Sequence, residues 1–239
     1  MRGASEHRRP SHEWVCLRLS DTMQALALAL LCLCLAGSSW AQKPRPCASP
    51  ALQVGSFSSM DGKGNLATYG KYRYDALGQK VRFSQMRTYE NRTTTVDLLV
   101  LFNERVLYQI DWLRFSCKKK ALSSEFQPME VPRDATLVGQ VVVGTASAFG
   151  QGLLVNTWVG HDAEKNGTYM AVFTGIGCLP VSAMYHKEET GWTMLSFFNI
   201  LLGIDDPQVF FPPAFCKYAP LEGTTNVFDA ILDKDLMQE

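Results

Sequence analysis

The chain has 239 residues, of which 46% are hydrophobic and 19% are charged, and these proportions exclude a disordered chain. It carries 23 lysines and arginines against 23 aspartates and glutamates, so its formal net charge is zero. A nucleic-acid-binding protein, or a protein held on membranes by a basic surface, needs an excess of positive charge. Composition therefore predicts a globular protein with no nucleic-acid partner, and it leaves the function open.

An apolar leader opens the chain. The run Ala25–Ala36 has 12 residues, which suits the hydrophobic part of a signal peptide and is too short to cross a bilayer of about 30 Å. Small residues follow at the two positions that a signal peptidase reads, Ser39 and Ala41. We predict a signal peptide over residues 1–41, with Met23 as an alternative start, and a secreted mature chain over residues 42–239 without a transmembrane anchor. The alternative is an uncleaved signal anchor, which the lack of a stop-transfer pattern disfavours.

Four cysteines remain once the leader is removed. They are more than thirty residues apart and form no C-x-x-C pair, so a metal site is disfavoured. An even number of cysteines in a secreted chain predicts two disulfides, with three possible pairings that remain open. The four residues are Cys47, Cys117, Cys178 and Cys216.

Strand patterns dominate the mature chain. Residues 65–75 are rich in tyrosine and threonine, residues 80–85 alternate, and a turn signal lies between them, so this pair predicts a hairpin. The runs Val96–Phe102 and Val106–Asp111 flank a polar tip and predict a second hairpin. The first of these runs is apolar on both faces, so it is either covered on both sides or lines a cavity.

Few helices are predicted. Asn226 is suited to cap a short helix over residues 226–238, and the lysines 118–120 are interpreted as a solvated loop. Without long helices between strands, a parallel sheet is disfavoured, and we predict a mainly β, antiparallel fold in one domain. The further strands are predicted at Gly139–Thr145, Gly152–Val159, Thr168–Gly175, Val181–His186 and Trp192–Leu202.

Two N-glycosylation sequons agree with secretion. Their acceptors are Asn91 in Asn-Arg-Thr and Asn166 in Asn-Gly-Thr. Each lies in a polar break between strand-like runs. We therefore predict that both asparagines carry glycans on surface loops.

Motifs of catalysis are missing from the sequence. It contains no Gly-x-Ser-x-Gly elbow and no phosphate-binding Gly-rich loop before Lys and Ser or Thr. The run Met60–Asn65 resembles only the start of a calcium loop and is interpreted as a surface turn, so the ligands of any metal stay unknown. His161 and His186 have no neighbouring ligand or nucleophile. We predict that the chain is not an enzyme.

The closing run Leu202–Cys216 resembles the signature of the ependymin family, which ends in D-P-x-V-F-x-P-P-x-x-C. The resemblance covers residues 44–216, nearly the whole mature chain, and is nearest to the ependymin-related members found across vertebrates. Further stretches that resemble the family follow in the right order: Pro44–Cys47, Tyr74–Asp75 with Gly78–Arg82, Tyr108–Asp111 and Cys178–Val181.

The resemblance implies a fold and a set of properties. The fold is a half-open sandwich of curved antiparallel sheets with a deep apolar pocket, similar to bacterial lipoprotein carriers. The family is secreted or lysosomal, N-glycosylated and homodimeric, and is linked to binding of lipids such as gangliosides, to calcium and to cell–matrix adhesion. The resemblance also implies the pairing Cys47–Cys178 and Cys117–Cys216.

One departure from the ependymin-related members concerns the tail. Those members typically join a position before the central hairpin to the C-terminal tail through a further disulfide. Here the residues around Asn91 and the tail after Cys216 both lack cysteine. The paired loss leaves the attachment of the tail open, with the predicted tail helix as a substitute.

Two functions follow from the resemblance and the apolar strands. The first is a glycoprotein that binds amphipathic or anionic lipids in a pocket, with His161 or His186, once protonated, favouring an anionic head group at its mouth. The second is a calcium-associated adhesion glycoprotein without a lipid ligand. The predicted pocket wall combines residues from the central hairpin and the late strand: Leu98, Val100, Phe102, Tyr108, Ile110, Trp192, Met194, Phe198 and Ile200.

Overall fold

The structure is a computed structural model. The chain divides into two compact units, residues 1–43 and residues 44–239. In the first unit, residues 22–32 form a helix with exposed side chains, and no described helix is long and apolar enough to cross a membrane. The acceptor asparagines of the two predicted sequons, Asn91 and Asn166, and the predicted cleavage site lie outside the described residues. Those described are 22–32, 43–62, 66–89, 92–148, 150–162, 167–188 and 191–232.

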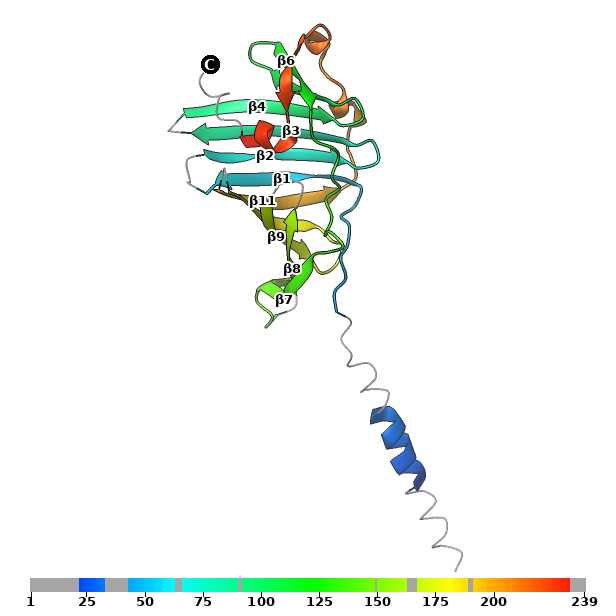
Figure 1. The fold of residues 1–239 in the computed structure, drawn as a ribbon. Helices are drawn as coiled ribbons and strands as arrows, with labels where there is room; N and C mark the ends of the chain where they lie inside the picture. The colour runs from blue at the N-terminus through cyan, green and yellow to red at the C-terminus, as the bar shows by residue number, and fades with distance from the viewer. Residues whose placement is uncertain are drawn as a thin grey trace, which may run out of the picture. The chain divides into compact units, whose positions relative to one another are not determined.

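The second unit is built on one sheet of twelve strands, in the order β12-β6-β5-β4-β3-β2-β1-β11-β10-β9-β8-β7 (Figure 1). All neighbours pair antiparallel except β12 and β6, which pair in parallel. The strands are β1 (Leu52–Asp61), β2 (Leu66–Asp75), β3 (Lys80–Tyr89), β4 (Arg92–Leu101), β5 (Val106–Asp111), β6 (Ser116–Leu122), β7 (Thr136–Gly144), β8 (Gly152–Asp162), β9 (Gly167–Thr174), β10 (Pro180–Lys187), β11 (Gly191–Leu202) and β12 (Leu221–Thr225).

Two antiparallel runs make up this sheet. Strands β1 to β6 follow one another in space, and so do β11 to β7, and the pairing of β1 with β11 joins the two runs. Figure 1 shows β7 and β8 running across the direction of β1 to β4, which agrees with the twist that accumulates in large sheets. The predicted mainly β, antiparallel fold is confirmed, as are both predicted hairpins.

Local chemistry explains the first hairpin. The backbone N–H of Gly78 donates to Oδ1 of Asp75 at 2.7 Å, and Gln79 has a positive φ of 51°, so the chain reverses within four residues. The tail helix α2 (Val227–Leu232) is also present, and the backbone N–H of Ala230 donates to the carbonyl of Asn226. The predicted residues of the helix beyond Leu232 lie outside the described part of the chain.

The interpretation of lysines 118–120 as a solvated loop is wrong. They belong to β6, where Lys119 pairs with Tyr108 and its Nζ lies 5.5 Å from the centre of the Tyr108 ring. Lysine can serve in a strand because its aliphatic stem covers apolar surface while the ammonium stays in water. The run of lysines therefore gave no sign in the sequence of a strand that is stabilised by pairing with β5.

Alternation gives the sheet two faces, which we name by what they carry. The helix face bears Phe57, Tyr72, Phe83 and Leu98, which form a core with Ala230 and Ile231 of α2. The open face is the opposite one and includes Met60 and Tyr69. In β1 to β3 each strand sends successive side chains to alternate faces, so the cross-strand registers assign every residue to one face.

Part of the open face is covered by the chain that follows β11. This segment contains the short helices η1 (Pro207–Phe210) and η2 (Ala214–Cys216), and Phe210 and Cys216 pack against Leu99 and Ile110. Cys216 is bonded to Cys117 of β6, and Cys47 is bonded to Cys178 beside a third core around Trp158. These are the two pairings that the family resemblance implies.

A buried ion pair joins the strands to this covering segment. Arg82 donates to both carboxylate oxygens of Asp97, at 2.9 and 2.6 Å, and its Nη1 donates to the carbonyl of Val209 at 2.6 Å. Trp112 Nε1 also donates to Asp97, at 2.6 Å. Removal of the carboxylate charge therefore leaves a buried guanidinium without compensation.

We predict that Asp97→Asn lowers the free energy of unfolding by about 3–5 kcal/mol, measured by urea denaturation. The matched control is Asp111→Asn, because the Asp111–Arg114 pair spans 3.8 Å with both side chains exposed, and its loss is expected to cost less than about 1 kcal/mol. Equal losses in the two variants would contradict the structural role of the buried pair.

Candidate functional site

The central hairpin does not form the single apolar wall that its sequence predicted. Leu98 pairs with Gln109 on the helix face, whereas Tyr108 pairs with Leu99 on the open face. Partners in an antiparallel pair share a face, so register decides which residues meet, and alternation within each strand cannot. The five hairpin residues of the predicted pocket wall therefore do not share one face. Leu98 and Val100 lie on the helix face, while Tyr108 and Ile110 lie on the other.

These hairpin residues are packed inside cores. Leu98 and Val100 are 1% and 0% exposed, and Tyr108 and Ile110 are also buried. Phe102 is half-buried and its ring lies 5.1 Å from that of Phe126 in an edge-to-face contact. These apolar side chains therefore pack between the sheet and the segments that cover it.

The late strand behaves differently. Trp192 and Met194 of β11 are 47% and 46% exposed on the open face. The ring of Phe198, two positions beyond Ser196 on the same face, stacks at 5.7 Å on the ring of Tyr69. Ile200, the last predicted wall residue, is half-buried.

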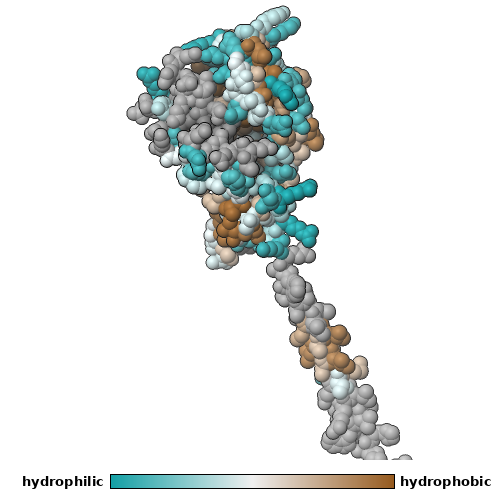
Figure 2. Space-filling view, in the orientation of Figure 1, coloured by the Kyte–Doolittle hydropathy of each residue, from teal (hydrophilic) through white to brown (hydrophobic). Residues whose placement is uncertain are grey.

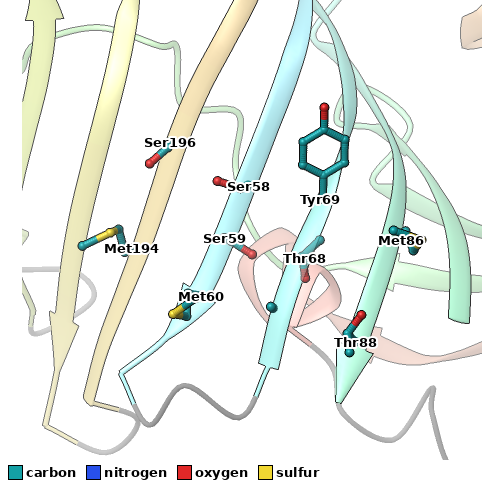
Figure 3. A pocket seen from close by; sticks show the side chains of 10 residues that line it. Ser58, Ser59, Met60, Thr68, Tyr69, Met86, Thr88, Met194 and Ser196 are labelled. Atoms are coloured by element: carbon teal, nitrogen blue, oxygen red, sulfur yellow. The ribbon is translucent and has the colours of Figure 1, made fainter. Parts of the chain in front are cut away.

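A hollow of about 290 Å³ opens on this face (Figure 3). Register explains its composition, because Met60 pairs with both Ala67 and Met194, and Tyr69 pairs with Met86. Figure 3 shows Met86 on one side of the Tyr69 ring and Met60 and Met194 on the other, with Ser58 between Tyr69 and Met194. We call it the methionine hollow; it is lined by Ser58, Ser59, Met60, Ala67, Thr68, Tyr69, Met86, Thr88, Met194 and Ser196. The cross-strand registers place the side chains of Ser59 and Thr68 on the helix face, so the serine and threonine hydroxyls on the open face are those of Ser58, Thr88 and Ser196.

The methionine hollow is apolar and open to solvent. Met60, Tyr69, Met86 and Met194 are each about half exposed. Methionine is flexible and polarisable, so it adapts to apolar ligands of variable shape. The lining includes no aspartate, glutamate, histidine, lysine or cysteine, so the hollow offers apolar contact and hydroxyl hydrogen bonds.

Both histidines of the mature chain lie in one row beside the methionine hollow. His161 pairs with Thr168, Thr168 with His186, and His186 with Trp192 on successive strands of the same face. The ring of His186 lies 4.7 Å from that of Trp192. The row reaches β11 at Trp192, two residues from Met194 of the methionine hollow.

A second polar feature lies on the helix face, and sequence reasoning missed it. Ser59 pairs with Thr68, Thr68 with Arg87, and Arg87 with Thr94, which gives one row across β1 to β4. We call it the polar row. The hydroxyls of Ser59, Thr68 and Thr94 are buried and accept or donate no hydrogen bond within the described residues. Single serines and threonines carry no signal in a strand, and only the register brings these together.

Arg87 is the charged member of the polar row and is fully buried. Its Nη2 donates to the carbonyl of Ala230 in α2 at 2.5 Å. With the Gln85 amide turned so that its oxygen faces Arg87, that oxygen accepts two further hydrogen bonds from the guanidinium. This hydrogen bond attaches the C-terminal tail to the sheet. It accounts for the attachment that the missing disulfide left open.

Comparison with known proteins identifies the family. The family model for ependymin matches residues 90–216. Ependymin-2 of Carassius auratus is 37% identical over 202 residues, covering 84% of this chain and 93% of that protein. Ependymin of Notemigonus crysoleucas is 36% identical over 202 residues, with coverages of 84% and 92%. The chain belongs to the ependymin family.

Two solved structures resemble this ependymin-family chain distantly. An uncharacterised conserved protein of Thermus thermophilus has a TM-score of 0.46 at 10% identity, covering 75% of this chain and 91% of that one. The Pseudomonas aeruginosa MucA/MucB complex has a TM-score of 0.39 at 12% identity, with coverages of 69% and 56%. At these TM-scores the likeness carries no inference about function.

Tyr72, a member of the helix-face core, gives a test of burial. Burial raises its pKa from 10.0 to about 12, and its hydroxyl has no hydrogen-bond partner among the described residues. The unfolded chain releases the Tyr72 proton near pH 10 and the folded chain near pH 12. The stability that depends on neutral Tyr72 is therefore complete below pH 10 and is lost as the pH rises toward 12.

We predict that Tyr72→Phe keeps or raises the free energy of unfolding at pH 7, by up to about 1 kcal/mol, and weakens its decline between pH 10 and 12. The control is Tyr74→Phe, which removes the acceptor of the Met129 N–H at 2.9 Å and is expected to cost about 1 kcal/mol. Urea denaturation across this pH range measures both. A loss at pH 7 in Tyr72→Phe as large as that of the control contradicts the prediction.

Proposed function

We propose that this ependymin-family protein is a secreted, N-glycosylated, non-enzymatic protein that binds an amphipathic lipid, with the acyl chain in the methionine hollow. One observation carries the proposal: Met60, Met86 and Met194, from three strands, stand half exposed around the Tyr69 ring. A contiguous apolar surface exposed on a soluble protein marks a site of interaction. The extracellular space is the proposed location, and the lysosomal lumen is the alternative.

The energetics favour a ligand with a long apolar tail. Each methylene removed from water contributes about 0.8 kcal/mol, so about eight methylenes contribute roughly 6 kcal/mol. A gain of that size offsets the lower part of the association cost, which is about 4–15 kcal/mol. The lining hydroxyls hydrogen-bond to a polar group at the edge of the hollow.

An anionic head group fits the histidine row beside the hollow. His186 contacts Trp192, and His161 lies two strands further on the same face. A protonated imidazole attracts a carboxylate, a phosphate or the sialic acid of a ganglioside. The ligand class proposed is therefore an anionic amphipathic lipid, with gangliosides among its members.

The alternative function is calcium-associated adhesion without a lipid. Within the described residues no three histidine, cysteine, aspartate or glutamate side chains cluster in a way that could hold a metal ion. The structure therefore supplies no observation that favours a calcium site. The lipid proposal is supported by an apolar surface, and the next experiment separates the two functions.

We predict that the double variant Met60→Ser, Met86→Ser lowers the affinity for oleate by about tenfold, because it removes apolar contacts worth about 1.4 kcal/mol. Titration calorimetry measures the affinity, and quenching of Trp192 by dibromostearate reports where the chain lies. The matched control is Leu113→Ser, which changes an 88% exposed side chain in the turn after β5. The adhesion function is favoured if the wild type binds no oleate and dibromostearate does not quench Trp192.

The homodimer is also a proposal, and the free edge of β7 supports it. This strand has no charged residue, its outer edge has no partner strand among the described residues, and Figure 2 shows apolar surface at the β7–β8 end. Unprotected apolar edges invite strand pairing, and two copies of one edge can pair antiparallel about a two-fold axis. The exposed apolar residues there are Val138, Val141, Val142, Val143, Leu153 and Leu154.

We predict that Val141→Lys shifts the protein from dimer to monomer in sedimentation velocity, because a lysine on an edge strand opposes pairing. Leu113→Lys serves as the control at a similarly exposed apolar position outside the edge and keeps the dimer. A wild type that is monomeric at micromolar concentration rejects the dimer, and a variant that stays dimeric rejects this edge as its interface.

A further inference from the structure

We propose that the open face binds a soft monovalent metal ion, copper(I), through the thioethers of Met184 and Met194, the imidazole of His186 and the face of the Trp192 ring. The four residues lie on β10 and β11, at the edge of the methionine hollow. Of the four, Met194 alone also lines that hollow. Metal binding is therefore a property separate from the lipid binding proposed above.

The register between β10 and β11 brings the four side chains together. Met184 pairs with Met194, and His186 pairs with Trp192. Directly opposed residues have Cβ atoms about 4.5–5.5 Å apart, and the two pairs are two residues, about 7 Å, apart along the strands on one face. The four side chains therefore start from the corners of one small patch, within reach of a single ion.

Further methionines flank this patch on both sides. Met60 of β1 pairs with Met194, and Met170 of β9 pairs with Met184. Four methionines thus form one cross-strand row over four neighbouring strands of the sheet. Methionine has a flexible side chain, so its sulfur can move toward a ligand. The row supplies a neighbouring thioether on each side of the assigned pair.

The donor atoms select the metal. Thioether sulfur is a soft ligand that favours copper(I), whereas calcium and magnesium require oxygen ligands. The two thioethers and a neutral imidazole carry no charge, so they do not neutralise a divalent ion. In the described part of the chain, no three histidine, cysteine, aspartate or glutamate side chains cluster as a metal site. The donors of ordinary zinc and calcium sites are therefore not assembled there.

Trp192 supplies a second kind of contact. Its ring centre lies 4.7 Å from that of His186, and the two ring planes are inclined at 47° rather than stacked. The face of an indole ring attracts a cation, and tryptophan does so more strongly than tyrosine or phenylalanine. An ion bound to the His186 imidazole therefore lies beside the indole, which attracts it and shields one side of it from water.

The patch is accessible and its side chains are partly held in place. Trp192 and Met194 are about half exposed, while Met184 and His186 are half-buried. The paired backbones of β10 and β11 fix where all four side chains begin. Binding sites built on strands in this way are more precise than sites built on loops. An ion from solvent therefore reaches the donors without a rearrangement of the sheet.

Silver(I) is the probe, because it has the charge and closed electron shell of copper(I) and keeps its oxidation state in air. With free thiols blocked by N-ethylmaleimide, we expect a single equivalent of silver to bind in titration calorimetry and to quench tryptophan emission. Trp192→Phe is expected to abolish this quenching. Copper(I) kept reduced by ascorbate is expected to reproduce the effect, and calcium is expected to have none.

Methyl spectra of the wild type locate the ion. In protein labelled with carbon-13 at the methionine methyl groups, we expect silver to shift the signals of Met184 and Met194, which single variants assign. The signal of Met86 is the internal control, because β3 is three strands from β11, about 14 Å away, and it is expected to stay unchanged.

The double variant Met184→Leu, Met194→Leu tests the thioethers, because leucine keeps the apolar volume and removes the sulfur. We expect silver affinity to fall by at least about tenfold, since even the outer partners of metal ligands are worth about 10- to 100-fold. His186→Gln is expected to weaken silver binding as well. The matched control Met86→Leu keeps the affinity of the wild type.

The outcomes separate the metal site from the lipid site. The double variant keeps the apolar surface, so it is expected to bind oleate as the wild type does while it loses silver. Silver affinity that the double variant leaves unchanged overturns the proposal, and so does a wild type in which silver alters neither Trp192 emission nor the Met184 signal. Zinc that binds as tightly as silver and quenches Trp192 overturns it too, because the thioethers then select nothing. If circular dichroism shows that the double variant does not fold, the wild-type methyl spectra decide.

Discussion

The pairing of β1 with β11 is the constraint on which the rest of this structure depends. It joins Gln53 to Leu202 and Asp61 to Thr193, so two antiparallel runs that are each built from local hairpins become one sheet. Closing so long a loop has an entropy cost, and the Cys47–Cys178 disulfide reduces it by tying the segment before β1 to the turn before β10. The same pairing sets Met60 beside Met194 and thereby creates the methionine hollow.

The two faces of the sheet are covered to different extents, because the segments that cover them are short. The segment after β11 covers the open face only where Phe210 and Cys216 meet the core around Leu99, and the methionines further along are left bare. On the helix face, α2 contributes Ile231 to the core, and its Ala230 carbonyl accepts a hydrogen bond from Arg87 of the polar row. One sheet therefore carries an apolar surface that is exposed and a polar row that is hidden, the reverse of what burial alone favours. Such inversions are expected where a protein binds a ligand.

Prediction from sequence succeeded where the signal was local. The turn at Asp75, whose carboxylate accepts from Gly78, and the apolar runs of β4 and β5 on either side of a polar tip needed no distant partner to be recognised. It failed for β1, which is rich in serine and stands between two partner strands, and for β6, where lysines concealed a strand. In both cases tertiary pairing outweighed intrinsic strand propensity.

The sequence by itself determined the class of the fold, the even cysteine count, the sequons and the family, because these depend on residue type and order along one chain. The tertiary structure alone decided which side chains meet. Leu98 and Tyr108 each fit the alternation expected of a residue in the pocket wall. The register between β4 and β5 nevertheless places them on opposite faces of the sheet. Register likewise lines up Ser59, Thr68 and Arg87, which lie far apart in sequence. The physical reason is that a period of two fixes faces within a strand, whereas the relation between strands is set by turns and by pairing over long distances.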